Sequence, residues 1–167
     1  MLRYRHLGGL LLALTVALVA CEKDEPEPTS TVSPSEKVAP SPVGTNQTVL
    51  DKTFPLKTTA TYEFEIPSHA AMPHLHGMFE SFAGQAKGPS DESANIDFLI
   101  LNQDQEADFA NSRPGEALFQ AEASHNQAVN FDLPTSLDHP VKYYLVFRNP
   151  EGRKSSKVVE ANFRVDF

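Results

Sequence analysis

Apolar and polar residues alternate along the C-terminal two thirds of the chain, with the two-residue period of half-buried β-strands. The pattern is cleanest over residues 159–167, where Val, Ala and Phe take every second position and polar residues lie between them. Residues 60–66 repeat it, with Tyr62, Phe64 and Ile66 on one face. Six further segments are predicted as strands: 48–57, 74–82, 95–102, 116–123, 128–133 and 141–149.

Turn-forming residues separate the predicted strands, at Gly88-Pro89, Pro114-Gly115, His139-Pro140 and residues 149–152. Short strands with frequent turns predict an all-β fold, which we expect to be a single antiparallel β-sandwich of about eight strands with jelly-roll topology. Residues 104–111 are ambiguous and allow one helical turn after a strand. The β-sandwich domain is expected to cover residues 47–167, a length that supports a hydrophobic core without disulfides.

Residues 1–20 have the layout of a signal peptide, because two arginines precede an apolar run over residues 7–20. That run is shorter than the roughly 20 residues that a membrane-spanning helix needs. It ends in Leu18-Val19-Ala20-Cys21, which resembles the lipobox of bacterial lipoproteins. The resemblance implies cleavage before Cys21 and its acylation with two or three chains, enough for lasting attachment to a membrane. Ordinary cleavage after Ala20 is the alternative, but it favours a small residue where Leu18 stands.

Residues 21–46 begin with the lipidated cysteine and continue as a linker rich in Pro, Ser, Thr and Glu, with no aromatic residue. Such a segment buries too little apolar surface to offset its ordering entropy, so a disordered spacer is expected. In the lipoprotein family, Glu22 in place of Asp favours the outer membrane, and Lys23-Asp24-Glu25 looks like a signal for surface display. We therefore expect a lipid-anchored protein of the bacterial cell envelope, on the periplasmic or surface face.

The chain has a formal charge of −8 at pH 7, and loss of residues 1–20 removes Arg3 and Arg5 but no acid. Such an acidic protein is not expected to bind nucleic acid, because that affinity depends on Lys and Arg near phosphates. Cys21 is the single cysteine, so no disulfide can form within the chain.

The last hairpin has a pattern of its own: an aromatic strand over residues 143–149, a short turn with Ser155 and Ser156, and then Lys157-Val158-Val159. It is similar to the closing hairpin of GOLD (emp24-like) β-sandwich domains. The resemblance implies a noncatalytic domain that mediates protein or lipid-associated interactions, and it assigns no functional residue.

Three of the six histidines, His69, His74 and His76, lie close together in the sequence. On a strand, His74 and His76 share one face, opposite Leu75 and Phe79. Two imidazoles at this spacing bind one zinc or copper ion, with His69 or a methionine of the preceding turn as a third ligand. The alternative is a group of surface histidines at the start of a strand.

An acidic stretch follows, comprising Asp91, Glu92, Asp97, Asp104, Glu106, Asp108 and Asn111. Oxygen-rich loops hold calcium, and the spacing from Asp104 resembles that of an EF-hand loop. However, Phe109 stands where such a loop requires glycine, and the closing glutamate is missing. A solvated acidic loop is therefore the favoured interpretation.

Motifs of serine hydrolases, zinc metalloproteases and phosphate-binding loops are absent, and no cofactor is expected. Ser136, Asp138 and His139 are neighbours in a predicted turn, but sequence adjacency is no evidence of a catalytic triad. We therefore expect a noncatalytic interaction module that binds an envelope protein. The alternative is a ligand-binding module, for a metal at the three histidines or for a glycan at exposed tyrosines. The tyrosines that could contact a glycan are Tyr62, Tyr143 and Tyr144, and Tyr144 is expected to face away from Tyr143 and Phe147.

Overall fold

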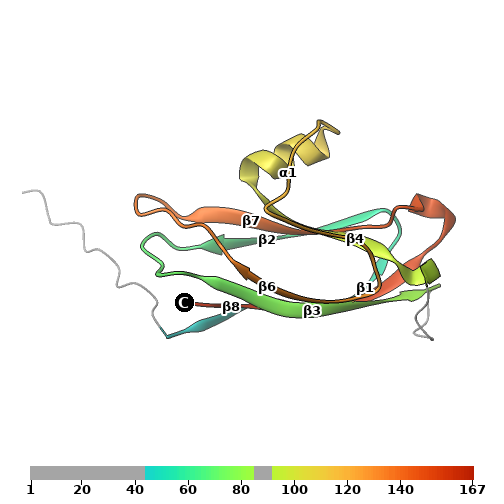
Figure 1. Ribbon diagram of the computed structural model, residues 1–167, viewed down its shortest axis with the longest axis horizontal. Helices are drawn as coiled ribbons and strands as arrows, with labels where there is room; N and C mark the ends of the chain where they lie inside the picture. The colour runs from blue at the N-terminus through green and yellow to red at the C-terminus, as the bar shows by residue number, and fades with distance from the viewer. Residues whose placement is uncertain (1–43, 85–91) are drawn as a thin grey trace, which may run out of the picture. The chain divides into compact units, whose positions relative to one another are not determined.

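The computed structural model describes residues 44–84 and 92–167, which form two four-stranded antiparallel sheets packed as a β-sandwich (Figure 1). The predicted all-β fold is confirmed, and each predicted strand is present with slightly shifted ends. The strands are β1 (Asn46–Leu56), β2 (Thr59–Ile66), β3 (His74–Ala83), β4 (Ile96–Asn102), β5 (Phe119–Ser124), β6 (Asn126–Asp132), β7 (Val141–Arg148) and β8 (Lys157–Asp166). The predicted signal peptide, Cys21, most of the linker, Gly88-Pro89 and Asp91 lie outside the described residues.

The strand order is β1-β8-β3-β6 in the first sheet and β2-β7-β4-β5 in the second. The pairs β1–β8, β2–β7, β3–β6 and β4–β5 are those of one long hairpin. The pairs β3–β8 and β4–β7 close the rolled-up hairpin into two sheets. This connectivity is the predicted jelly roll. The C-terminal strand β8 lies between β1 and β3 and is therefore central to its sheet.

The inner faces of the two sheets enclose a core rich in phenylalanine. The rings of Phe98 and Phe163, one from each sheet, stack with their centroids 5.2 Å apart. The ring centroid of Phe98 also lies 5.0 Å from that of Phe147 and 5.4 Å from that of Phe79. All four rings are fully buried. Aromatic pairs stabilise a core beyond the area that they bury, which suits a domain without a disulfide.

Gly77 permits a close approach of β3 and β8. A Cβ atom at this position would lie 2.2 Å from the carbonyl oxygen of Asn162 and 2.8 Å from the Cα of Phe163. The strand alternation turns residue 77 toward the core, between the buried Leu75 and Phe79. Phe163 therefore occupies space that any larger residue at position 77 would need.

The described chain enters and leaves the sandwich at one end, where the amide of Gly44 donates to the carbonyl of Phe167 at 2.6 Å. The opposite end of β1 leads into the β1–β2 turn at residues 57–58, beside the β7–β8 connection. That connection contains the short 3₁₀ helix η2 (Gly152–Lys154). A second 3₁₀ helix, η1 (Glu92–Ala94), precedes β4.

Asn149 joins the two connections at this end. It is 3% exposed, and its Nδ2 donates to the carbonyl oxygens of Lys57, Gly152 and Ser155 at 3.2, 2.9 and 2.5 Å. Its backbone amide donates to the carbonyl of Thr58 at 2.7 Å. A buried side chain with these partners fixes both turns relative to each other.

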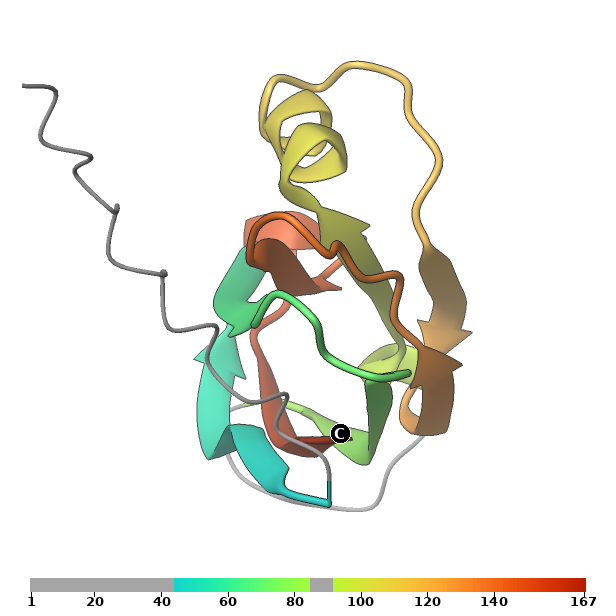
Figure 2. The ribbon, with the colours of Figure 1, turned by 90° about the vertical axis from the view of Figure 1, so that its left-hand side faces the viewer.

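The helix α1 (Gln103–Ala110) follows β4 directly and stands on the outer side of the second sheet (Figure 2). Asn102 caps it, since its Oδ1 accepts from the amide of Gln105 and its own amide donates to Gln105 Oε1, both at 2.9 Å. The expectation of a single turn was too short, because α1 has eight residues. Within residues 44–84 and 92–167, no helix has the length and apolar character that crossing a membrane requires.

Candidate ligand-binding cleft

An apolar patch on the outer face of the second sheet holds α1 in place. Leu99, Leu101 and Val146 form the patch, and Phe109 of α1 packs on it with Ala117 of the returning loop. Every residue of β4 before its last is buried, so this strand is covered on both faces. The connection between β4 and β5 is therefore a fixed structure packed against the sheet, with its own small cluster of apolar contacts.

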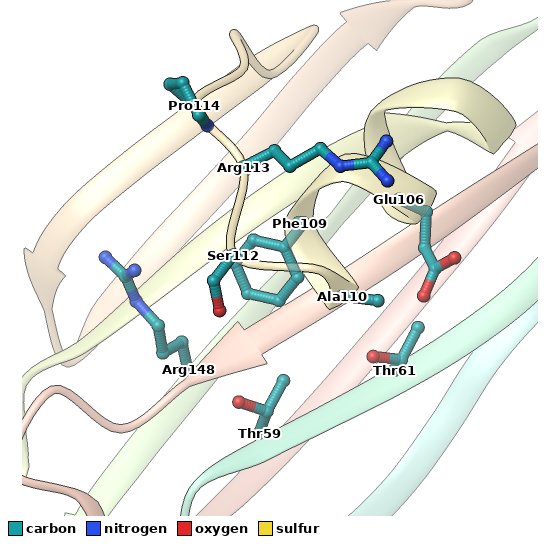
Figure 3. Close-up of a pocket in the computed structure, with 9 residues that line it drawn as sticks. All are labelled: Thr59, Thr61, Glu106, Phe109, Ala110, Ser112, Arg113, Pro114 and Arg148. Carbon is teal, nitrogen blue, oxygen red and sulfur yellow. The ribbon is translucent and has the colours of Figure 1, made fainter.

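A cleft of about 810 Å³ lies between α1 and the edge strand β2 (Figure 3). Its lining residues are Thr59, Thr61, Glu106, Phe109, Ala110, Ser112, Arg113, Pro114 and Arg148. In Figure 3 the ring of Phe109 lies between Arg148 on one side and Glu106 on the other. A volume of this size is typical of sites for small molecules.

A buried carboxylate fixes the guanidinium of Arg148. Arg148 donates from Nε and Nη2 to Oδ2 of Asp97, at 3.0 and 2.8 Å. Asp97 is 5% exposed, and its Oδ1 accepts from the amide of Ala123 at 3.1 Å. The side chain of Arg148 is 45% exposed, so the donors that Asp97 does not use remain available. Arg148 is thus preorganised for binding at the edge of the cleft.

The remaining charged groups of the cleft are Glu106 and Arg113. Glu106 points from α1 toward β2, where Thr59 and Thr61 supply hydroxyls (Figure 3). Arg113 has a carboxylate partner of its own, with its Nη1 3.3 Å from Oδ1 of Asp108. Because each arginine is paired with an acid and Glu106 adds one negative charge, the cleft disfavours an anionic ligand.

Tyr144 lies on the outer face of β7 within a small polar network. Nearby, Lys142 Nζ donates to Glu63 Oε1 at 2.6 Å, a hydrogen bond that lowers the pKa of Glu63 and raises that of Lys142. Burial raises the pKa of Tyr144, and the charge of Glu63 adds to the effect. Tyr144 packs against the apolar patch of Leu99, Leu101 and Val146, and it therefore covers part of the outer face of the second sheet.

Tyr62, Tyr143 and Tyr144 do not form an exposed surface on which a sugar could stack, although the glycan hypothesis required one. Tyr143 is buried and donates from its hydroxyl to the carbonyl of Pro134 at 2.5 Å. Tyr62 is half-buried, with its ring centroid 5.1 Å from that of Phe54. The aromatic ring available in a cleft is that of Phe109.

His74 and His76 share the outer face of β3 as expected, opposite the buried Leu75 and Phe79. Their rings stack with centroids 6.3 Å apart. His74 also contacts Asn130, and its Nδ1 lies 2.6 Å from Oδ1 of Asp132. His76 Nδ1 lies 3.4 Å from Oδ2 of Asp166. The hydrogen bond to Asp132 raises the pKa of His74, and the bond to Asn130 adds to it.

His69 lies in the turn before β3, where its amide donates to the carbonyl of Ser136 at 3.1 Å and its φ is 62°. No group of three or more His, Cys, Asp or Glu among the described residues is arranged to hold a metal ion. The structure therefore does not unite His69, His74 and His76 as one set of ligands.

From Asp104 to Asp108 the acidic stretch is helical, in contrast to the loop that both interpretations of its sequence assumed. Asp104, Glu106 and Asp108 lie on α1, and Asn111 caps its C-terminal end by donating from Nδ2 to the carbonyl of Ala107 at 2.6 Å. Asp97 belongs to β4 and pairs with Arg148, while Glu92 opens η1. The calcium loop suggested by the spacing from Asp104 is therefore wrong, because Asp104, Glu106 and Asp108 belong to a helix and not to a loop.

Ser136 and His139 do meet in an exposed turn, with Ser136 Oγ 3.2 Å from His139 Nδ1. The same oxygen accepts from the amides of Asp138 and His139, at 3.2 and 3.4 Å. These are the bonds of a serine that caps a turn.

Sequence patterns alone do not single out Arg148, Phe109, Thr59 or Thr61. One signal was available: Asp97 interrupts the apolar run of β4, and a lone acid in a buried strand requires a partner. That Arg148 is the partner follows from the pairing of β4 with β7, where Asp97 and Arg148 are directly opposite.

No protein-family model matches the sequence, and no curated protein matches it. Among solved structures, the chain is similar to TmCBM61 in complex with beta-1,4-galactotriose. The TM-score is 0.39 and the sequence identity is 9%, over 68% of this chain and 67% of that chain. A similarity at this level assigns neither a family nor a ligand.

Proposed function

We propose that this protein is an exported bacterial lipoprotein whose jelly-roll domain is a noncatalytic binding module, with its ligand site in the cleft under α1. The charged start, the apolar run and the lipobox of residues 1–21 support the anchor at acylated Cys21. Glu22 supports placement at the outer membrane. The proline-rich linker then acts as a spacer between the lipid and the domain.

The observation that carries the binding site is the guanidinium of Arg148, held by Asp97 beside the ring of Phe109 in a cleft of about 810 Å³. Fixed donors lose little entropy when a ligand binds, because their geometry is set beforehand. An aromatic ring flanked by hydrogen-bonding groups suits a ligand with one apolar and several polar faces.

These groups favour a neutral, hydroxyl-rich ligand of the saccharide class. Phe109 would contact the apolar face of a sugar ring, while Arg148, Glu106 and the threonine hydroxyls would bond to its hydroxyl groups. The paired arginines and the added charge of Glu106 disfavour an anionic compound.

A glycan array tests the site with the soluble chain of residues 22–167, which retains every described residue. We expect saccharide binding that Phe109→Ala weakens at least about tenfold, the loss of roughly 1.4 kcal/mol. Because Phe109 also packs on the sheet, Thr61→Val serves as a second variant that keeps the strand. Met78→Ala, on the outer face of the other sheet, is the control. Absence of binding to any saccharide contradicts the site, and so does binding by both cleft variants that is as tight as that of the wild type.

Labelled palmitate tests the anchor independently. We expect incorporation into the full chain expressed in bacteria and none into Cys21→Ser. If the wild-type chain takes up no label, the protein is not a lipoprotein, whatever the cleft binds.

A further inference from the structure

The end of the sandwich opposite Gly44 and Phe167 carries a basic hollow of about 520 Å³. It is lined by Lys57, Thr58, Arg153 and Ser156. A neighbouring hollow of about 430 Å³ shares Lys57 and Ser156, and Phe54, Pro55 and Val158 supply its apolar side. Cationic, hydroxyl and apolar groups therefore meet in one small region.

Among the described residues, the positive charge of this region has no carboxylate partner. The chain has a net charge of −8, yet no carboxylate lines either hollow. Within residues 44–84 and 92–167, no carboxylate pairs with Lys57 or Arg153. The nearby Glu151 pairs with the buried Lys157, and the distance from Glu151 Oε2 to Lys157 Nζ is 3.8 Å. The two exposed cations are thus free to attract an anion.

The scaffold of the hollow is rigid. Lys57 and Thr58 belong to one turn and Arg153 to the other, and Asn149 bonds to the backbone of both turns. The buried Oγ of Ser156 has no hydrogen-bond partner in the described part of the chain. The hydroxyl of Thr58, in the exposed turn beside Lys57, is the one that the hollow presents to a ligand.

We propose that this end of the domain binds a phosphate group that carries an apolar substituent. The guanidinium of Arg153, the ammonium of Lys57 and the hydroxyl of Thr58 form a donor set that suits phosphate oxygens. The adjoining hollow of Phe54, Pro55 and Val158 receives the substituent. A soluble organic phosphate and a phospholipid headgroup share this chemistry. No residue lines both this region and the cleft under α1, so the two proposals stand or fall separately.

The test follows amide signals of the 22–167 chain by NMR during titration with phenyl phosphate, inorganic phosphate and phenol. We expect phenyl phosphate to shift signals of residues 53–58 and 153–158. It should bind about tenfold more tightly than inorganic phosphate, because the ring buries apolar area. The double variant Lys57→Gln/Arg153→Gln should lose at least about tenfold in affinity. Lys52→Gln/Arg164→Gln removes the same charge elsewhere and should bind as the wild type does.

Sedimentation with vesicles containing phosphatidic acid distinguishes the two sources of the phosphate. Binding to phenyl phosphate alone supports a soluble ligand, and binding to both supports a lipid headgroup, provided that Lys57→Gln/Arg153→Gln weakens it. No saturable binding in either arm, or an equal effect of both double variants, overturns the proposal.

Discussion

Arg148 of β7 donates two hydrogen bonds to one carboxylate oxygen of Asp97, the residue directly opposite it on the neighbouring strand β4. The other oxygen of Asp97 accepts from the amide of Ala123 in β5. One buried carboxylate therefore links three strands at the position where the cleft under α1 begins. The same pair both stabilises the sheet and orients a donor toward the cleft.

Asp97→Asn should lower the free energy of unfolding by about 1–2 kcal/mol, because it preserves the shape of the side chain but removes its charge. The half-exposed Arg148 can be solvated in the variant, which keeps the loss below that of a fully buried pair. Urea denaturation measures the difference. Asp51→Asn on the exposed side of β1 is the control and should change stability by less than about 0.5 kcal/mol. Equal effects of the two substitutions would show that the pair is not stabilising.

Gly77→Ala should destabilise the domain by about 2–3 kcal/mol, because the new Cβ overlaps backbone atoms of Asn162 and Phe163. Backbone in the middle of a sheet cannot move aside as a flexible side chain would. Gly115→Ala is the matched control, since its Cβ would meet nothing closer than 3.8 Å. Thermal unfolding of both variants gives the comparison, and a stable Gly77→Ala would mean that β3 and β8 are further apart than described.

The strands were predictable because burial on one face forces a two-residue period. Val159, Phe163 and Val165 are buried while Glu160 and Arg164 are exposed, as their alternation requires. The same reasoning placed His74 and His76 on one face. It could not place His69, because the path of a turn depends on contacts with distant residues such as Ser136.

The full length of the helix and the position of the cleft were not predicted, for two different reasons. The capping box of Asn102 and Gln105 is visible in the sequence, but the spacing of Asp104, Glu106 and Asp108 is also that of a solvated acidic loop. The cleft depends on where α1 packs, and that is set by Phe109 meeting Leu99 and Val146 from separate strands. The alternation of residues along one strand does not predict which residues of other elements pack against it.

Asn149→Ala should lower the free energy of unfolding by about 2–3 kcal/mol, because it leaves backbone carbonyls of two turns without their shared donor. The loss should be greatest near Lys57 and Ser155, where hydrogen exchange would accelerate. Asn126→Ala, an exposed position at the start of β6, is the control. Comparable exchange in the two variants would contradict the role of Asn149 as the link between the turns.

His74 should make stability depend on pH in a defined direction. Its pKa is raised in the folded state, first by the hydrogen bond to Asp132 and then by that to Asn130. The protonated ring is therefore favoured by folding. This contribution is fully present below the unfolded pKa of about 6.5 and is lost as the pH rises through the raised folded value.

His74→Gln should accordingly cost more stability at about pH 5 than at about pH 9, because only the protonated ring gains from the carboxylate of Asp132. Asp132→Asn should lower the pKa of His74 in an NMR titration, whereas Asp51→Asn removes a carboxylate from β1 and should leave it unchanged. The pair is exposed to solvent, so added salt should reduce the difference between the two pH values. An equal cost of His74→Gln at both pH values would mean that Asp132 does not stabilise the charged ring.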